Sequence, residues 1–516
     1  MGNSLLAVRG INHKYIVVEM RIIMSDKMKC PHFGQCGGCN IIDKPYDKQL
    51  EQKKAYVNEQ LKGYAAVDMV YGMEEPFHYR NKVHVVISRK KASGDHSKKA
   101  PDRYDKSGKN VKGEIVAGIY EEESHNVVPV EECLLHDAYA NEIIKSIVDI
   151  MKKGRFEPYD EDRETGCIRH VLIRRGHITK ETMVVIVTGT RIFPGNKNFI
   201  RELLKRHPDI TTIVHNINYK RTSMVLGENQ RTLYGKGYIE DVLCGLRFRI
   251  SPKSFYQINS IQTELLYDKA IEFADLKGNE TVIDAYCGIG TIAMAAAKSA
   301  GKVIGVELNK DAVRDARINA RINNVGNVEF YNDDAGRFME RTAVKVDAVF
   351  IDPPRSGSDE KFLCSLIRLK PERIVYVSCN VETQRRDLGV LSKGGYTVEK
   401  ACAVDMFPGT NHTESIVLLS KLKSNKLKHI DVELEMDELE LTVAESKATY
   451  EEIKDYVLKQ SGLKVSSLYI AQVKQKYGII ERENYNLPKS ENSKQPKCPL
   501  EKEKAIIAAL KYYRMI

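Results

Sequence analysis

The chain has 516 residues, of which 42% are hydrophobic and 29% are charged. At roughly 100–200 residues per domain this length predicts about three domains, and the composition excludes a wholly disordered or membrane-embedded protein. The 80 Lys and Arg residues exceed the 70 Asp and Glu residues, and the net charge of +10 is compatible with a polyanionic partner.

The first 28 residues form a short N-terminal extension. Arg9, His13 and Lys14 interrupt it, so it has neither the apolar core of a signal peptide nor the length of a membrane-spanning helix. We therefore expect a cytoplasmic protein that makes no contact with a membrane.

The densest group of cysteines lies directly after this extension. Eleven cysteines are too few for a disulfide scaffold in a chain this long. Three of them, Cys30, Cys36 and Cys39, stand within ten residues with Pro and Gly between them, which is typical of a metal site. Together with Cys133 they supply the four thiolates that hold a zinc ion or an iron–sulfur cluster, and the spacing does not choose between the two. Reduced thiols that bind nothing are the alternative.

Residues 29–250 are predicted to form an α+β domain. A helical pattern covers residues 46–61, strand patterns dominate residues 79–245, and two further helical patterns lie at 140–153 and 197–207. The stretch 89–112 contains nine Lys and Arg residues, which predicts a long basic loop that is either a solvated insertion or an arm contacting phosphate.

Strand and helix patterns alternate through residues 251–422, which predicts a doubly wound, mostly parallel α/β sheet with its ligand beyond the carboxyl ends of the strands. Residues 423–516 change composition again and are predicted to form a small C-terminal accessory module. Its acidic stretch at 431–440 and its helices suggest a winged or helix-turn-helix-like unit, or a packing appendage.

A glycine-rich loop follows the strand that ends at Asp284. Gly288 and Gly290 lead into a helix, and Glu307 ends the next strand nineteen residues after Gly288. Glycines at a helix start let a ligand approach the backbone, and a carboxylate at that spacing accepts hydrogen bonds from ribose hydroxyls. These features predict an adenosine-containing cofactor, and a dinucleotide also satisfies them.

The motifs CPHFGQCGGC, SPKSFYQIN, DAYCGIGT, DPPRSG, VSCN and HTES occur in this order between residues 30 and 419. The chain thereby resembles the RNA uracil-5-methyltransferases that use S-adenosylmethionine. The resemblance implies an enzyme that methylates C5 of a uridine through a covalent bond between a cysteine and C6. It implies that Cys379 in VSCN is the nucleophile and that Glu414 in HTES is the base that removes the C5 proton.

The resemblance also implies the cofactor-binding residues: Gln257, Tyr286, Glu307 and Asp352, with Asp334 and Thr291 as weaker candidates. Each of these roles has a structural alternative. Tyr286 and Gln257 can serve ordinary packing and surface polarity, and Asp334 can serve a turn. Cys379 can be a buried structural thiol, and Glu414 a solvated loop carboxylate.

In this family the four-cysteine pattern holds a [4Fe-4S] cluster in the ribosomal-RNA branch, so the resemblance favours that cluster and large-subunit (23S) ribosomal RNA as the substrate. Transfer RNA with the same chemistry and an inactive iron–sulfur RNA-binding protein are the alternatives. We expect a monomer without a protein partner.

The sequence also offers side chains for RNA binding outside the reaction centre. Phe255 and Tyr256 can stack on an unstacked uracil, or they can be core residues. Five basic residues can also meet phosphates, with isolated surface charge as the default explanation: Arg80, Lys82, Arg169, Arg174 and Arg175.

Overall fold

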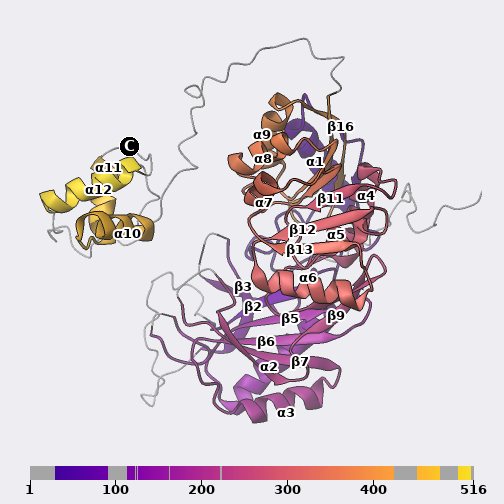
Figure 1. Cartoon of the computed structure of the whole chain (residues 1–516). Coiled ribbons are helices and arrows are strands. Elements are labelled where there is room, and N and C mark those ends of the chain that lie inside the picture. Colours follow the sequence, from indigo (N-terminus) through magenta and orange to yellow (C-terminus); the bar gives the residue numbers. More distant parts are fainter. Residues whose placement is uncertain are drawn as a thin grey trace, which may run out of the picture. The chain divides into compact units, whose positions relative to one another are not determined.

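The computed structural model describes residues 29–90, 113–122, 124, 126–161, 163–220, 224–422, 450–476 and 498–512. The predicted N-terminal extension, most of the predicted basic loop and the acidic stretch at 431–440 lie outside these ranges. The chain divides into two compact units, residues 1–426 and 427–516, which are described separately (Figure 1). No helix in the described ranges has the length and apolar character needed to cross a membrane.

Much of the predicted α+β region forms a seven-stranded sheet in the order β4-β3-β2-β5-β6-β7-β8. Its strands are β2 (Lys82–Arg89), β3 (Ile115–Tyr120), β4 (Val127–Pro129), β5 (Ile168–Arg175), β6 (Thr182–Thr188), β7 (Ile210–Ile217) and β8 (Asn229–Tyr234). Only β6 and β7 are parallel, and the crossover α3 (Asn196–Arg206) joins them, as parallel strands require. Helices α2 (Ala138–Gly154) and α3 cover one face of this sheet (Figure 1).

The second sheet of this unit has eight strands in the order β1-β16-β17-β15-β14-β11-β12-β13. Its strands are β1 (Val70–Tyr71), β11 (Thr281–Asp284), β12 (Lys302–Glu307), β13 (Val328–Asn332), β14 (Ala348–Ile351), β15 (Arg373–Ser378), β16 (Tyr396–Val404) and β17 (Glu414–Lys421). Neighbouring strands are parallel except where β17 pairs with β15 and β16. The predicted mostly parallel α/β sheet is therefore confirmed.

Helices cover both faces of the parallel sheet because its strands are apolar on both sides. Val282 and Ile283 are neighbours on β11, yet they belong to different cores. The core of one face includes α4 (Ser260–Ala274), α5 (Thr291–Ala296) and α6 (Lys310–Ile322), and that of the other includes α1 (Tyr46–Gln60), α7 (Ala335–Arg341), α8 (Glu360–Leu369) and α9 (Val381–Lys393).

Segments of the predicted 29–250 domain also pack with the parallel sheet. Val57 and Leu61 place α1 in the core of the parallel sheet, and β1 extends that sheet along β16. The hairpin of β9 (Ile239–Leu243) and β10 (Leu246–Ile250) also contributes to the core that α4, α5 and α6 share. Helical and strand periods predict elements but not the sheet that each one joins, so segments of 29–250 belong to the neighbouring fold.

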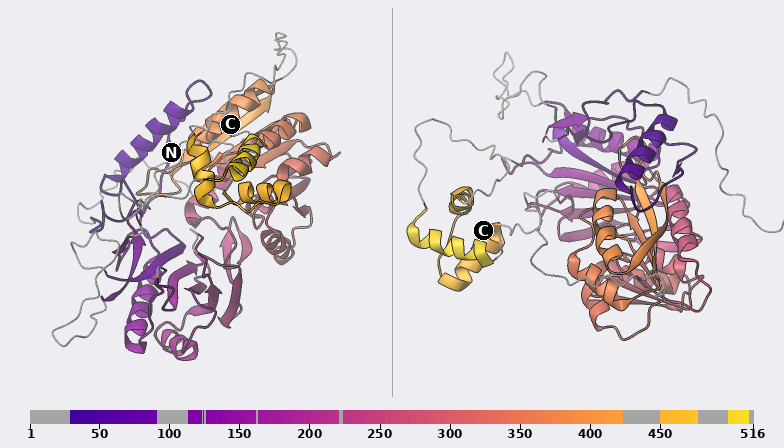
Figure 2. Two further views of the ribbon diagram at one scale, coloured as in Figure 1. Left: turned by 90° about the vertical axis from the view of Figure 1, so that its left-hand side faces the viewer. Right: turned by 90° about the horizontal axis from the view of Figure 1, so that it is seen from above.

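The described residues of the C-terminal unit form three helices, α10 (Tyr450–Ser461), α11 (Ser467–Lys476) and α12 (Leu500–Tyr512) (Figure 2). One core residue from each, Ile453, Ile470 and Ile506, is fully buried in a shared core. The helices thus have a small core of their own, and the winged or helix-turn-helix-like assignment stays a prediction.

Candidate active site

The predicted functional residues gather at the carboxyl edge of the parallel sheet. Glu307 is the last residue of β12, while Asp352 and Cys379 directly follow β14 and β15. Glu414 is the first residue of β17, which runs antiparallel to β15 and pairs Ser415 with Ser378. The reversed direction of β17 therefore brings Glu414 to the edge where Cys379 and Asp352 lie.

Glu414 is a buried carboxyl group and Asp352 a half-buried one, and the two influence each other. Burial, followed by the negative charge of Asp352, raises the pKa of Glu414 well above its ordinary value, and the positive charge of Arg355 opposes this shift. Burial also raises the pKa of Asp352, to about 7. Glu414 is 3% exposed, and its Oε2 has no hydrogen-bond partner among the described residues. A buried, unpartnered carboxyl oxygen with a raised pKa suits proton transfer to or from a ligand.

Cys379 is half-buried beside these carboxyl groups. Burial, followed by the charges of Glu414 and Asp352, raises the pKa of its thiol from 9.0 to about 11. Arg355 acts in the opposite direction, through its charge and a hydrogen bond to the thiol. The Arg355 carbonyl accepts hydrogen bonds from Asn380 Nδ2 at 3.1 Å and Thr383 Oγ1 at 3.3 Å, which ties its loop to the segment after Cys379. Arg355 therefore favours the reactive thiolate form.

The sequence prediction did not include Arg355. Its position in DPPRSG, three residues after Asp352, was the available signal, because a basic residue in a strand-end loop can face the same ligand as the acidic residue before it.

We expect alkylation of Cys379 by iodoacetamide to keep accelerating up to pH 10, since its thiolate forms at higher pH than that of a free cysteine. Arg355→Met should slow alkylation at pH 8, because it removes the cation that stabilises the thiolate. The rates can be measured by peptide mass spectrometry in a Cys364→Ser background, which lacks an exposed competing thiol. A rate for Cys379 that levels off at pH 8, or that Arg355→Met leaves unchanged, would contradict this electrostatic description.

The glycine loop and Glu307 form the predicted cofactor edge. The Glu307 carboxylate accepts hydrogen bonds from the backbone N–H groups of Gly288 (3.1 Å) and Asn309 (2.7 Å), which fixes its direction at the strand end. Gly288 has φ +54° and open space where a side chain would stand. Gly290 has φ +85°, and a Cβ there would lie 2.6 Å from the Phe330 ring. Gly290 thus lets the loop pack against Phe330, while Gly288 leaves the backbone open beside an oriented carboxylate, as ribose binding requires.

The other predicted cofactor residues have varied surroundings. The ring of Tyr286 packs against Phe362 with the ring centroids 5.3 Å apart. Thr291 begins α5, and its hydroxyl forms a 3.0 Å hydrogen bond with that of Tyr267. Asp334 caps α7, because its Oδ1 accepts a hydrogen bond from the Arg337 N–H at 2.9 Å.

Gln257 is only 7% exposed, and its carbonyl accepts a 2.9 Å hydrogen bond from Asn81 Nδ2. The contacts of these four residues neither support nor oppose a role in cofactor binding, which stays a prediction.

Asp284 is a further acidic group of this edge that the sequence prediction used only as the end of a strand. It is 1% exposed, and burial, followed by the charges of Asp352 and Glu307, raises its pKa to about 8. Asp284 thus connects the glycine loop electrostatically with the carboxyl groups beside Cys379. Its position directly before the glycine loop was the signal in the sequence.

The structure separates the two aromatic candidates for base stacking. Tyr256 is 4% exposed, and its hydroxyl donates a hydrogen bond to Asp241 Oδ2 at 3.3 Å, so it is a core residue. Phe255 is 65% exposed and remains a candidate for stacking on a base.

Three of the five basic residues considered for phosphate binding make internal contacts. Arg174 and Arg169 are buried, the former donating to the Ser254 carbonyl at 2.5 Å and the latter pairing with Glu161 at 2.6 Å. The Arg80 guanidinium donates to the carbonyl of Gly38 at 3.2 Å. Because β5 is buried on both faces, Arg169 and Arg174 lie in the interior and do not support the suggested phosphate contacts. The suggestion for Arg80, Lys82 and Arg175 stays a prediction.

The four predicted metal ligands line a single pocket with Arg80, and all are free thiols: Cys30, Cys36, Cys39 and Cys133. Across the described ranges no group of three or more Cys, His, Asp or Glu side chains is arranged to hold a metal ion as it stands. The donor set itself suits a thiolate-bound metal. Burial, followed by the charges of the other three thiols, raises the pKa of Cys39 to about 12, and a bound cation would remove that cost.

Comparisons with known proteins give the family. A sequence model described as tRNA (Uracil-5-)-methyltransferase matches residues 224–422. An uncharacterized RNA methyltransferase from Oceanobacillus iheyensis is 40% identical over 76% of this chain and 82% of its own length. One from Halalkalibacterium halodurans is 39% identical, over 76% of this chain and 82% of its own length.

A solved structure shows the same fold over much of the chain. It is the Pyrococcus abyssi tRNA (uracil-54, C5)-methyltransferase in complex with S-adenosyl-L-homocysteine. That structure is 28% identical with a TM-score of 0.59, and the match covers 75% of this chain and 86% of that one. The strand-edge site and these relatives together show that the chain belongs to the S-adenosylmethionine-dependent RNA methyltransferases of the uracil-5 type.

Proposed function

We propose that the protein methylates C5 of a uridine in large-subunit (23S) ribosomal RNA through a covalent bond between Cys379 and C6 of the uracil. The observation that carries the covalent route is the half-buried Cys379 thiol beside Arg355 and the two carboxyl groups of Asp352 and Glu414. C5 of uracil is a weak nucleophile, and addition of a thiolate to C6 converts the C5–C6 double bond into an enolate.

Each side chain then has one task. Arg355 favours the thiolate of Cys379, whose sulfur forms the bond to C6. S-adenosylmethionine, when bound, would supply the methyl group: C5 of the enolate would form the new carbon–carbon bond as the methyl–sulfur bond breaks and S-adenosylhomocysteine leaves. Glu414 then takes the proton from C5, the electrons of that C–H bond restore the double bond, and the C6–S bond breaks to release Cys379. The raised pKa of Glu414 makes it a stronger base for this step.

The adenosyl cofactor fits the glycine loop. We assign the ribose hydroxyls to Glu307, whose carboxylate direction is fixed by Gly288 and Asn309. Tyr286, Asp352 and Gln257 are proposed to complete the pocket, with Thr291 and Asp334 at its margin. The Asp334 assignment is the weaker because one of its oxygens already caps α7.

The pocket of four cysteines is proposed to hold a [4Fe-4S] cluster. Methyl transfer changes no oxidation state, so we assign the cluster a structural role. The backbone N–H groups of Asn40 and Ile41, directly after Cys39, each donate to the carbonyl of Gly409 at 3.1 Å. A cluster that orders this segment would therefore support the loop that leads to Glu414.

Protein purified without oxygen is expected to be brown and to contain iron and sulfide. Cys133→Ser should lose the cluster, because four thiolates are needed, whereas Cys167→Ser and Cys244→Ser should retain it. Iron analysis and the visible absorption spectrum measure this. A colourless protein that holds one zinc ion would show a zinc site instead.

Transfer RNA is the second candidate substrate, and a specific observation favours it. The matching solved structure is of an enzyme that acts on tRNA at uracil 54, and the matching family description also names tRNA. Incubation with labelled S-adenosylmethionine and separate ribosomal and transfer RNA pools distinguishes the two. Label in 23S RNA as 5-methyluridine supports the proposal, and label confined to transfer RNA replaces it with the second candidate.

A chain that ends at Lys423 is expected to fold, to bind S-adenosylmethionine and to methylate protein-free ribosomal RNA. Every residue assigned to chemistry precedes this point, and the three C-terminal helices have a core of their own. Isothermal titration with the cofactor and methylation rates measure the outcome against the full chain. Loss of cofactor binding would mean that the C-terminal residues belong to the catalytic fold.

A further inference from the structure

The proposed base, Glu414, lies at the start of β17, next to the loop of the β16–β17 hairpin. Residues 405–413, named here the hairpin loop, connect the two strands. Val404 and Glu414, the residues on either side of this loop, pair with each other. Glu414 Oε2 has no partner among the described residues, so side-chain contacts at that oxygen do not set its direction. The backbone conformation of the hairpin loop and of the Val404–Glu414 pair therefore contributes to its direction.

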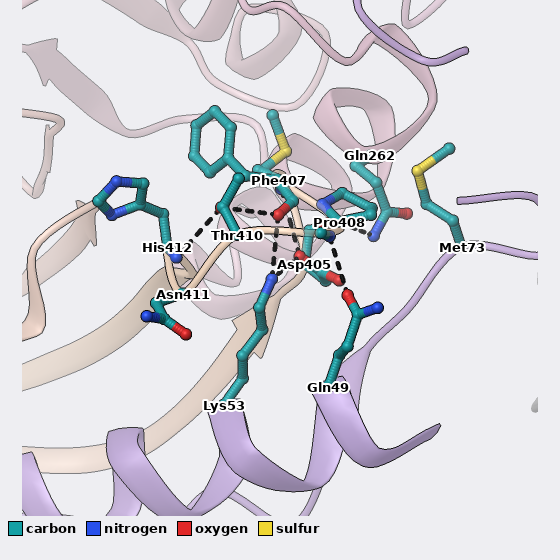
Figure 3. A network of polar contacts seen from close by, with 12 residues as sticks. Gln49, Lys53, Met73, Gln262, Asp405, Phe407, Pro408, Thr410, Asn411 and His412 are labelled. Atoms are coloured by element: carbon teal, nitrogen blue, oxygen red, sulfur yellow. Dashed lines mark hydrogen bonds and ion pairs between the residues drawn. The ribbon is translucent and has the colours of Figure 1, made fainter. Parts of the chain in front are cut away.

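A buried ion pair holds the first turn of the hairpin loop. Lys53 of α1 lies 2.5 Å from Asp405 Oδ1, and the two side chains are 1% and 0% exposed. Lys53 Nζ also donates to the carbonyl of Phe407 at 3.1 Å (Figure 3). The Phe407 N–H donates to Asp405 Oδ1 at 3.2 Å, and the Tyr46 hydroxyl donates to Asp405 Oδ2 at 3.0 Å. One ammonium group thus ties both ends of the turn to a helix from the N-terminal part of the chain.

The middle of the loop is held from the same side. The Gly409 N–H donates to Gln49 Oε1 at 2.9 Å, and Gln49 lies one helical turn before Lys53 on α1 (Figure 3). The Tyr79 hydroxyl donates to the Pro408 carbonyl at 3.0 Å. After these contacts the chain continues from Thr410 to Glu414. Lys53 and Gln49 therefore hold the segment that directly precedes the proposed base.

Stability alone is a poor explanation for a charge pair in this place. The free energy needed to desolvate two buried ions is about as large as the free energy of their attraction. Apolar side chains of similar volume often stabilise such a site equally well. An apolar residue at 53 would leave the Phe407 carbonyl and the Asp405 carboxylate without this donor. The ammonium therefore supplies geometry that an apolar side chain lacks.

We propose that Lys53 is a positioning residue whose contacts with Asp405 and Phe407 fix the hairpin loop and thereby aim the Glu414 carboxylate at the C5 proton. This inference rests on the proposed function of Glu414. Without these contacts the Val404–Glu414 pair would open more often, because the strand pair next to a loop becomes less stable when the loop moves more freely. Proton removal would then become slow, while attack by Cys379 and methyl transfer would continue.

The test compares Lys53→Met with wild type and with Lys54→Met, which removes an exposed lysine from the next position of the same helix. Active sites are counted with RNA that contains 5-fluorouracil, and single-turnover methylation of ordinary RNA is followed on denaturing gels. We expect Lys53→Met to bind S-adenosylmethionine within twofold of wild type, to turn over at least tenfold more slowly per active site, and to accumulate a methylated covalent complex. Lys54→Met should behave as wild type.

A merely destabilised protein would give fewer active sites with a normal rate at each and no accumulated complex, and that result for Lys53→Met would overturn the inference. If Lys53→Met does not fold, the double variant Lys53→Met/Asp405→Asn leaves no buried charge unpaired. It should fold and still accumulate the complex, and a normal rate for it would likewise overturn the inference. If wild type itself forms no complex with 5-fluorouracil RNA, the proposed function fails and this inference falls with it. Failure confined to the Lys53 variants removes only the positioning role.

Discussion

Cys379→Ala is expected to reduce methylation by roughly 10⁴-fold or more, the scale on which enzymes lose activity with a covalent nucleophile. Without the sulfur, C5 of the uracil is never activated, so the loss should be in the chemical step and not in cofactor binding. RNA that contains 5-fluorouracil should form a denaturation-resistant complex with wild type, because fluorine at C5 cannot leave as a proton. The complex should be absent with Cys379→Ala.

Cys364→Ala is the matched control, because Cys364 is an exposed cysteine in α8 of the same sheet fold. It should keep full activity and form the complex normally. An undiminished complex with Cys379→Ala would show that another group attacks C6.

Glu414→Gln is expected to lower turnover by about 10²–10⁴-fold, the usual contribution of a general base. Glutamine preserves the size of the side chain but cannot take the C5 proton. Cys379 should still attack and methyl transfer should still occur, so a methylated covalent complex should accumulate on ordinary RNA, where wild type shows almost none. Denaturing gels with labelled S-adenosylmethionine measure it.

Glu382→Gln provides the comparison for this variant, since Glu382 lies in the first turn of α9 just after Cys379 and is exposed. It should turn over normally. Normal turnover by Glu414→Gln, or lost turnover without any accumulated complex, would remove Glu414 from the role of base.

The parallel sheet was predictable because β11, β12, β14 and β15 are short apolar runs, each of which ends at or directly before a residue type that serves chemistry. Asp284, Glu307, Asp352 and Cys379 all stand at the ends of such runs, and parallel pairing brings those ends to one edge. The motifs then gave these positions their expected roles.

Contacts between distant segments were not predictable in the same way. The helix α1 buries Gln49 and Lys53 together with Tyr46 and Val57, so its buried side includes polar residues that a hydrophobic pattern does not mark. Its assignment to the parallel sheet and its contacts with Asp405 depend on tertiary packing. Arg355 had a signal in the sequence, its place in DPPRSG, but its effect on Cys379, a residue 24 positions away in the chain, depends on the fold.

The most direct test of methylation at C5 is the release of tritium from ribosomal RNA that carries [5-³H]uridine. Every methyl group placed on C5 displaces the hydrogen already there, so the reaction should release one tritium for each methyl group transferred from S-adenosylmethionine. Cys379→Ala should release none, and Glu414→Gln should transfer methyl groups ahead of tritium release. Methyl transfer by wild type without tritium release would place the methyl group on another atom and contradict the account.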